Sequence, residues 1–172
     1  MVSVPSAEIP DMLREHKARF AWAPSRALLA SIRAYQQHCG SRNPLSLLLQ
    51  KWAVLRHRFW SVITGADIPI NSQIAGGLLL PHANGVVIHP DAKIGPNCLI
   101  FQQVTIGTRS SGAAPQIGGH VDIGAGAKIL GPVKIGNHVL IGANAVVLID
   151  VPDNCMAVGI PAVVKPRPCQ ED

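Results

Sequence analysis

Aromatic and charged side chains are scarce in this sequence. Of its 172 residues only 4% are aromatic and 15% are charged, whereas 48% are hydrophobic. Such a chain is too apolar to be intrinsically disordered, and aliphatic side chains must fill its core. Its 16 glycines and 14 prolines oppose long helices and favour short extended segments joined by tight turns. The length predicts one main core, with room for a helical appendage but not for two full-sized catalytic domains.

Cysteine pairs and targeting signals are also lacking. The four cysteines are far apart and form no C-x-x-C motif: Cys39, Cys98, Cys155 and Cys169. Residues 1–20 do not resemble a basic segment followed by the apolar core of a secretory signal. We therefore expect a reduced, cytoplasmic protein. The histidines show no metal-ligand spacing, so no metal is expected.

No apolar run is both long and free of charge. The most apolar helical stretch, residues 45–64, contains Lys51, Arg56 and Arg58, which argues against a membrane span and leaves association with a membrane surface open. Residues 1–66 hold nine Lys and Arg against three acids, whereas residues 67–172 hold six against seven. No docking motif accompanies this charge, so no nucleic-acid partner is expected; a solvated helix face and an anionic partner both stay open.

A branched aliphatic residue returns at every sixth position through most of residues 68–147. The markers fall into three blocks: Ile68, Ile74 and Leu80; Ile88, Ile94, Ile100 and Ile106; Ile117, Ile123, Ile129, Ile135, Ile141 and Val147. A period of six fits neither a helix at 3.6 residues per turn nor a strand that alternates every two residues. It fits a chain that turns a corner every six residues and points each marker into a prism.

Three such sides complete one coil, and the repeats supply a little over four stacked coils. The sequence thus predicts a mainly β fold, a parallel β-solenoid with a C-terminal tail over residues 67–172, preceded by a small α-helical region over residues 1–66. Helices are expected over residues 25–37 and 45–63, with breakers between them. Capping of the first coil, packing against other subunits and docking on a surface are equally open roles for these helices.

The six-residue period is broken at two places, where residues must leave the prism. The spacing from Leu80 to Ile88 is eight positions, and that from Ile106 to Ile117 is eleven. Insertions that leave a regular repeat are where function is to be sought.

The first break presents an imidazole, that of His82, and a carboxylate lies fifteen residues earlier at Asp67, close to one circuit of the coil. An imidazole takes a proton from a hydroxyl near neutral pH, and a carboxylate on its other nitrogen fixes the tautomer. We therefore predict that His82 is a general base and that Asp67 orients it.

Four stretches carry a family resemblance: DIP at 67–69, LPHANGVVI at 80–88, GAGAKILG at 124–131 and GIPA at 159–162. They resemble signatures of the serine O-acetyltransferases and their close relatives among the hexapeptide-repeat acyltransferases, whose repeats form a left-handed parallel β-helix. The resemblance implies the same roles for His82 and Asp67, acetyl-coenzyme A as the donor substrate, and no metal. It also implies a homotrimer with the donor in a cleft between subunits; pairing of trimers stays open.

By the same resemblance, small residues would let the pantetheine arm approach the coil and basic residues would meet the coenzyme A phosphates. The donor candidates are Gly107, Ala125 and Ala143 for the arm and Arg109, Lys165 and Arg167 for the phosphates. Arg109 is equally a cation for an anionic acceptor. Asn84 and Asp91 are candidates for contact with the acceptor, although turn chemistry explains both equally well.

Several charged positions of the serine-specific pattern are replaced here. Pro81 stands where an Asp precedes the catalytic His, Ala113 and Ala114 replace an Arg-His pair, and Pro90 replaces an acid. A zwitterion needs a cation for its carboxylate and an anion for its ammonium, whereas a sugar hydroxyl needs neither. We therefore expect a sugar of a polysaccharide pathway as acceptor, as in similar short sequences, with L-serine as the alternative. A non-catalytic binding or scaffold solenoid is the third interpretation.

Overall fold

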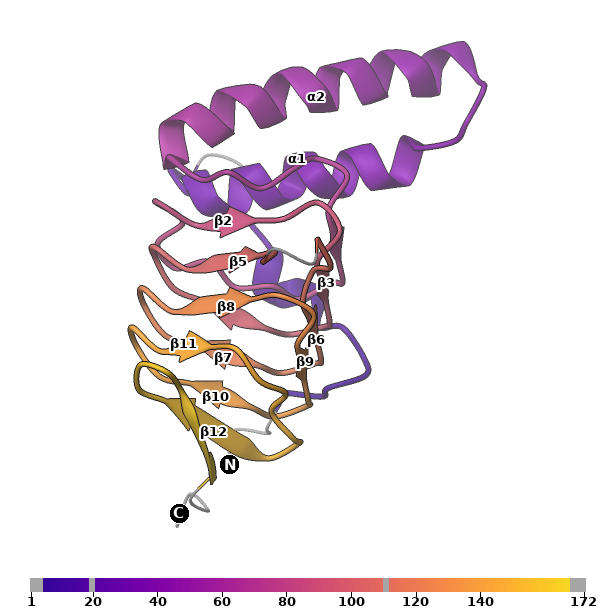
Figure 1. Ribbon diagram of the computed structural model, residues 1–172. Helices are drawn as coiled ribbons and strands as arrows, with labels where there is room; N and C mark the ends of the chain where they lie inside the picture. Colours follow the sequence, from indigo (N-terminus) through magenta and orange to yellow (C-terminus); the bar gives the residue numbers. More distant parts are fainter. Residues whose placement is uncertain (1–4, 19–20, 110–111, 168–172) are drawn as a thin grey trace.

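Three narrow sheets form the faces of a left-handed parallel β-helix (Figure 1). The computed structural model describes residues 5–18, 21–109 and 112–167. Face A contains β2 (Val87–Ile88), β5 (Thr105–Gly107), β8 (Lys128–Leu130) and β11 (Val146–Val147). Face B contains β1 (Gln73–Ile74), β3 (Lys93–Ile94), β6 (Gln116–Ile117) and β9 (Lys134–Ile135). Face C contains β4 (Leu99–Ile100), β7 (Asp122–Ile123), β10 (Leu140–Ile141), β12 (Cys155–Val158) and β13 (Val163–Pro166).

Each coil visits face A, then B, then C, and the chain passes through an A–B, a B–C and a C–A corner. The aliphatic markers point inward and stack on those of the next coil, as Ile88, Ile106 and Ile129 do through consecutive strand pairs. All three are at most 2% exposed. The predicted fold class is therefore confirmed, and its core is a column of aliphatic side chains. Among the strands of the described residues, only β13 runs antiparallel, folding back on β12.

Two long helices cover the open end of the β-helix. They are α1 (Pro24–His38) and α2 (Pro44–Thr64), close to the predicted ranges. The Asn43 side chain caps α2 by accepting from the Leu45 N–H at 3.0 Å, and the helix ends at Gly65 with a left-handed φ of 64°. The α1 helix lies between α2 and the first coil (Figure 1) and buries Leu28 and Ile32 in the core cluster of the β-helix. In the described part of the chain, neither helix combines the length and apolarity needed to cross a membrane.

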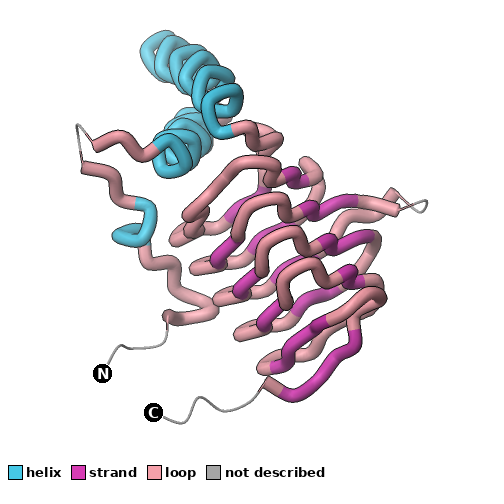
Figure 2. The backbone as a smooth tube through the Cα atoms, turned by 90° about the vertical axis from the view of Figure 1, so that its left-hand side faces the viewer, coloured by secondary structure: helices cyan, strands magenta, loops and turns pink. Residues whose placement is uncertain are grey.

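The N-terminal segment departs from the helical region that the sequence predicts. Residues 5–16, here called the N-terminal strap, lie along the side of the coils (Figure 2), and their one helical element is the short 3-10 helix η1 (Met12–Glu15). The strap is fixed by Asn97 at the B–C corner. Asn97 Nδ2 donates to the carbonyls of Ser6 at 2.7 Å and Ile9 at 2.8 Å, and its Oδ1 accepts from the Asp11 N–H at 2.8 Å.

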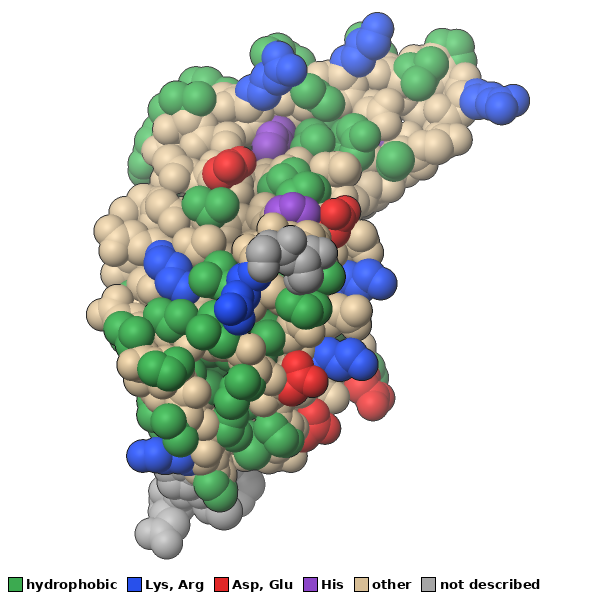
Figure 3. All heavy atoms as spheres, viewed as in Figure 1, with side chains coloured by type: hydrophobic (Ala, Val, Ile, Leu, Met, Phe, Trp, Pro, Cys, Tyr) green, Lys and Arg blue, Asp and Glu red, His purple; other side chains and the backbone are tan. Residues whose placement is uncertain are grey.

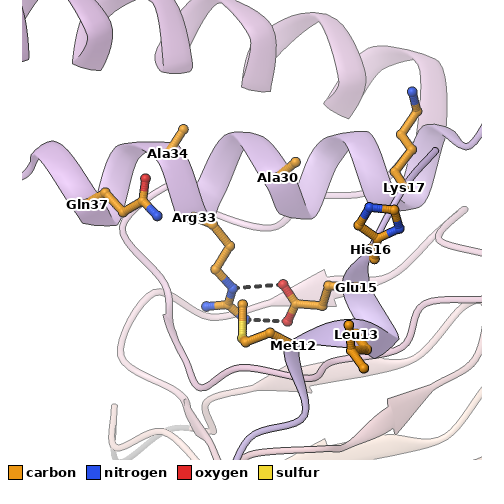
Figure 4. A pocket seen from close by; sticks show the side chains of 9 residues that line it. All are labelled: Met12, Leu13, Glu15, His16, Lys17, Ala30, Arg33, Ala34 and Gln37. Carbon is orange, nitrogen blue, oxygen red and sulfur yellow. Dashed lines mark hydrogen bonds and ion pairs between the residues drawn. The ribbon is translucent and has the colours of Figure 1, made fainter. Parts of the chain in front are cut away.

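An ion pair between η1 and α1 covers the edge of the first coil. Glu15 and Arg33 are joined by two contacts of 2.9 and 2.8 Å (Figure 4). Arg33 also donates to the carbonyls of Ile74 and Ala75, and Glu15 accepts from the Leu78 N–H at 3.0 Å. A groove of about 500 Å³ lies beside this pair, between η1 and α1. The pair thus satisfies backbone groups that a terminal coil would otherwise expose.

Candidate active site

The first inserted segment places His82 at the C–A corner between the first and second coils. Leu80 is buried at the end of face C, the His82 side chain is exposed, and Ala83 is buried again. Gly85 has a positive φ of 69°, and its N–H donates to the Gly65 carbonyl at 2.9 Å, so the segment rests on the end of α2. The packing therefore fixes this backbone and leaves the imidazole open to solvent.

Asp67 lies on the coil that borders this segment. Its N–H donates to the Val86 carbonyl at 2.8 Å and its carbonyl accepts from the Ile88 N–H at 2.9 Å. Because the inserted segment runs directly into Val86, the fold brings the backbones of Asp67 and His82 to the same corner. Both side chains are exposed, and no hydrogen bond joins them among the residues that the structure describes. The contact between imidazole and carboxylate stays a prediction.

The two residues predicted to contact the acceptor lie at opposite ends of β2. Asn84 belongs to the His82 segment, and its carbonyl accepts from the Gln103 N–H at 3.0 Å. Asp91 follows β2 at the A–B corner, where its N–H donates to His89 Nδ1 at 3.2 Å and its carboxylate lies 3.8 Å from the same nitrogen. Asn84 is therefore the neighbour of His82, whereas Asp91 belongs to a second cluster.

Arg109 joins Asp91 at the A–B corner, one coil further along. The Gly107 carbonyl accepts from the Gly131 N–H at 3.0 Å, and the Arg109 side chain packs over Gly131. A Cβ at position 131 would lie 3.1 Å from Arg109 Cδ, and the φ of 87° there also favours glycine. Since β2 and β5 are paired, Asp91 and Arg109 place an anion and a cation on successive turns of one corner.

Ala125 and Ala143 occupy successive turns of the C–A corner. The Asn144 N–H donates to the Ala125 carbonyl at 2.8 Å, and a Cβ at Gly124 would lie 2.6 Å from the Ala143 nitrogen. These turns therefore stack closely. Both alanines share their edge of the β-helix with His82, and Gly107 lies on the adjoining face A.

The two basic residues of the tail lie elsewhere. Lys165 is exposed on β13, opposite Met156 in the antiparallel ladder. Arg167 Nη1 donates to the His138 carbonyl at 3.1 Å, and its Nη2 lies 3.7 Å from Asp122 Oδ2. Asp122 begins β7, whereas Ala125 follows the end of that strand. The structure thus holds Arg167 at the B–C corner and does not bring it to the edge that carries His82.

A histidine pair that was not predicted from the sequence lies at the B–C corner. His120 Nδ1 and His138 Nδ1 lie 2.8 Å apart, and both residues have a positive φ. Burial lowers the pKa of His120, and the proximity of His138 acts in the same direction while Asp122 opposes it. Their separation of three hexads, one full coil, was the signal that could have revealed the pair. In the described ranges, no three His, Cys, Asp or Glu side chains gather in a way that could hold a metal ion.

The sequence of this chain is similar to those of known acyltransferases. Residues 114–148 match the family described as bacterial transferase hexapeptide (six repeats). A serine acetyltransferase of Synechococcus elongatus is 43% identical over 106 residues, which cover 60% of this chain and 43% of that protein. The chain is related to the serine acetyltransferases. The resemblance drawn from the sequence motifs is therefore confirmed.

Solved serine acetyltransferase structures superpose on most of the chain. The soybean enzyme complexed with serine gives a TM-score of 0.66 at 36% identity, covering 83% of this chain and 56% of that one. The Brucella abortus enzyme in complex with coenzyme A gives a TM-score of 0.69 at 31% identity, covering 83% and 56%. The chain thus spans about half the length of the serine acetyltransferases that it matches.

These comparisons do not support the sugar acceptor that the sequence analysis favoured; they fit the L-serine alternative better. The expectation of a sugar rested on four uncharged positions taken together, Pro81, Pro90, Ala113 and Ala114. The fold adds that charges from different coils can share a corner, as Asp91 and Arg109 do on successive turns of the A–B corner. The absence of charge at a few sequence positions therefore says little about which acceptor binds, because residues from several coils form the binding site.

Proposed function

We propose that this chain is an acetyl-coenzyme A-dependent O-acetyltransferase and that its acceptor is L-serine. The observation that carries the proposal is the exposed imidazole of His82 on a fixed backbone turn, in a β-helix that superposes on serine acetyltransferases. One of those relatives binds serine and another binds coenzyme A.

The proposed chemistry is a direct transfer between two bound substrates. His82 removes the proton of the acceptor hydroxyl, the oxygen attacks the thioester carbonyl, and coenzyme A leaves as its thiolate. Asp67, which borders the His82 segment, orients the imidazole and stabilises its protonated form. The exposed position of His82 lets an acceptor reach it without a change in the backbone.

The donor is proposed to lie along the edge that carries Ala125 and Ala143, with Gly107 beside it on face A. Small side chains at these positions leave room for the pantetheine arm against the coil. Arg109 is the proposed partner of the coenzyme A phosphates, because it carries a positive charge at the other edge of face A, where the aliphatic part of its side chain packs over Gly131. Arg167 is a weaker candidate, since it already contacts Asp122 and the His138 carbonyl.

The proposed assembly is a homotrimer in which the cleft between adjacent subunits completes the site. Residues that lie at separate corners of one chain, such as His82 and Arg109, then belong to different walls of one cleft or of neighbouring clefts. Association of two trimers is a further possibility that the mass in solution decides.

The test is thiol release from acetyl-coenzyme A with L-serine as acceptor and, separately, with a panel of sugars and nucleotide sugars. We expect turnover with L-serine, and we expect His82→Ala to reduce kcat by about a hundredfold or more. His38→Asn, in the last turn of α1, is the control and keeps wild-type turnover. Unchanged turnover in His82→Ala would refute the proposed role of this residue.

A sugar acceptor is the second candidate, and the uncharged residues Pro81, Ala113 and Ala114 favour it. The same assay separates the two, because turnover confined to sugars would exclude L-serine while leaving the roles of His82 and Asp67 intact. Release of no thiol with any acceptor would favour the non-catalytic interpretation.

A further inference from the structure

The outer surface of α2 is apolar and has no partner within the described part of this chain. Eight exposed apolar residues share one side of the helix, whereas Leu47, also exposed, lies off it: Leu45, Leu48, Leu49, Trp52, Leu55, Phe59, Val62 and Ile63. We call this surface the α2 stripe. The opposite side of the helix, around Ala53, packs on α1, and α1 in turn covers the first coil (Figure 1).

The α2 stripe is too extensive to be an ordinary scatter of surface aliphatics. Leu48 is 64% exposed, Leu55 is 58% exposed and Val62 is 82% exposed. Residues spaced by three, four and seven positions lie on one side of a helix, so these side chains form an apolar strip, which the partly exposed Arg56 interrupts. A strip of this kind marks an interaction surface.

Cations border the strip and acids are missing from the whole helical layer. Lys51 and Arg58 are exposed, and their spacing of seven residues places both along one margin of the α2 stripe. No Asp or Glu occurs between Glu15 and Asp67, a stretch that contains eight Lys and Arg. Figure 3 shows the resulting mixture of apolar and basic side chains over the helices.

The charge pattern favours an anionic lipid surface over a second copy of the chain as the partner of the α2 stripe. Two copies packed through the α2 stripe would bring Lys51 and Arg58 of each close to those of the other, with no acid from residues 16–66 to pair with them. An anionic lipid surface supplies the missing negative charge and accepts the apolar side chains.

The aromatic residues fit the same occupant. Trp52 is 58% exposed and Phe59 is 56% exposed within the α2 stripe, and Trp22 is 76% exposed nearby, with its ring 5.8 Å from that of Trp60. The amphipathic rings of tryptophans gather at the level of lipid headgroups, and phenylalanine inserts with the aliphatic side chains. We propose that the α2 stripe binds the surface of an anionic lipid bilayer, with α2 lying parallel to the membrane plane and the β-helix pointing away from it.

The test uses the whole chain and large unilamellar vesicles, one set of pure phosphatidylcholine and one containing phosphatidylglycerol at a third of the lipid. Sedimentation of the protein with the vesicles measures binding. We expect binding to the anionic vesicles that is at least about tenfold tighter than to neutral ones and that falls as salt is raised. All three tryptophans lie in residues 1–66, so a blue shift of their emission reports that the helical layer has entered the interface.

Two double variants separate the contributions of charge and apolar contact. Lys51→Gln with Arg58→Gln and Leu48→Gln with Leu55→Gln are each expected to weaken binding about tenfold or more. Matched controls lie outside the stripe: Lys93→Gln with Lys134→Gln removes two exposed cations of the β-helix, and Ile9→Gln with Leu13→Gln removes two exposed aliphatics of the strap. Both controls are expected to bind as the wild type does, and circular dichroism confirms that each variant is folded.

Three results would overturn the proposal. One is failure of the wild type to sediment with anionic vesicles, and a second is binding that the control pairs weaken as much as the stripe pairs do. The third is a change of mass in solution caused by Leu48→Gln with Leu55→Gln while vesicle binding is absent, which would assign the stripe to a second copy of the chain. None of these measurements uses an acetyl donor or acceptor, so their outcome is independent of the proposed activity.

Discussion

Arg33 reaches across from α1 to Glu15 and, with the same guanidinium, to the backbone of the first coil. The two side chains are only 16% and 7% exposed. The pair therefore links three elements that are distant in sequence: the N-terminal strap, the helical layer and the edge of face B. A buried pair of this kind is costly to break on one side, because the remaining charge is left without a partner.

Glu15→Ala is expected to lower the free energy of unfolding by about 3 kcal/mol, since it strands the Arg33 charge and removes the acceptor of the Leu78 N–H. Thermal or denaturant unfolding followed by circular dichroism measures the loss. Glu8→Ala, in the exposed part of the strap, is the control and should change stability by less than about 0.5 kcal/mol. Equal effects of the two substitutions would contradict the role assigned to the ion pair.

Asn97→Ala is expected to release the N-terminal strap. It removes three hydrogen bonds to strap backbone and leaves an alanine at a φ of 60°, which together should cost about 3 kcal/mol. Hydrogen exchange measured by mass spectrometry should show faster exchange in residues 5–16. Asn144→Ala shares the backbone strain, at a φ of 55°, but lies away from the strap. Faster exchange of the strap in both variants would show that strain, not side-chain bonding, is responsible.

Asp67→Asn should impair turnover while leaving the fold intact. The amide carries no charge to stabilise a protonated imidazole, so kcat should fall by about tenfold to a hundredfold with little change in KM. Asp67→Glu keeps the charge and should recover part of kcat. Steady-state kinetics across pH measure both effects. A wild-type kcat and pH profile in Asp67→Asn would remove Asp67 from the proposed mechanism.

Acidification should destabilise the fold through two histidines. Burial lowers the pKa of His57 and of His120 below 6.5, so below about pH 6.5 the unfolded chain binds protons at these positions more readily than the native chain does. The free energy of unfolding should therefore fall as the pH drops from 7 towards 5. His120→Asn should make this decline shallower, whereas His16→Asn, an exposed position, should not. A decline of unchanged slope in His120→Asn would exclude this residue as a source.

The hexad period predicted the β-helix because each inward position faces the same surroundings on every coil. Ile68, Ile100 and Ile141 are all at most 1% exposed, as a repeated core position requires. The strap could not be predicted in this way: Asn97 binds Ser6 and Ile9 across about ninety residues, and a single-sequence period carries no information about such a pairing.

The candidate site was predictable only in part, for a related reason. A break in the period located His82, because residues that leave the prism are visible as extra spacing. The acceptor could not be predicted, because the charges available at a corner depend on how the coils stack: the pairing of β2 with β5 places Asp91 and Arg109 on successive turns of one corner.

The register of the coils has a consequence for the way this scaffold changes. The chain needs 18 residues to pass from Ile88 to its partner Ile106, 20 from Ile74 to Ile94, and 23 from Ile94 to Ile117, yet each of these pairs is aligned in the ladder. The number of residues in a coil can therefore vary while the inward-pointing aliphatic residues stay aligned from one coil to the next. Segments at a corner can lengthen, shorten or be exchanged without disturbing the prism beneath them. New substrate preferences can thus arise from loop exchange alone, on a frame that is already folded.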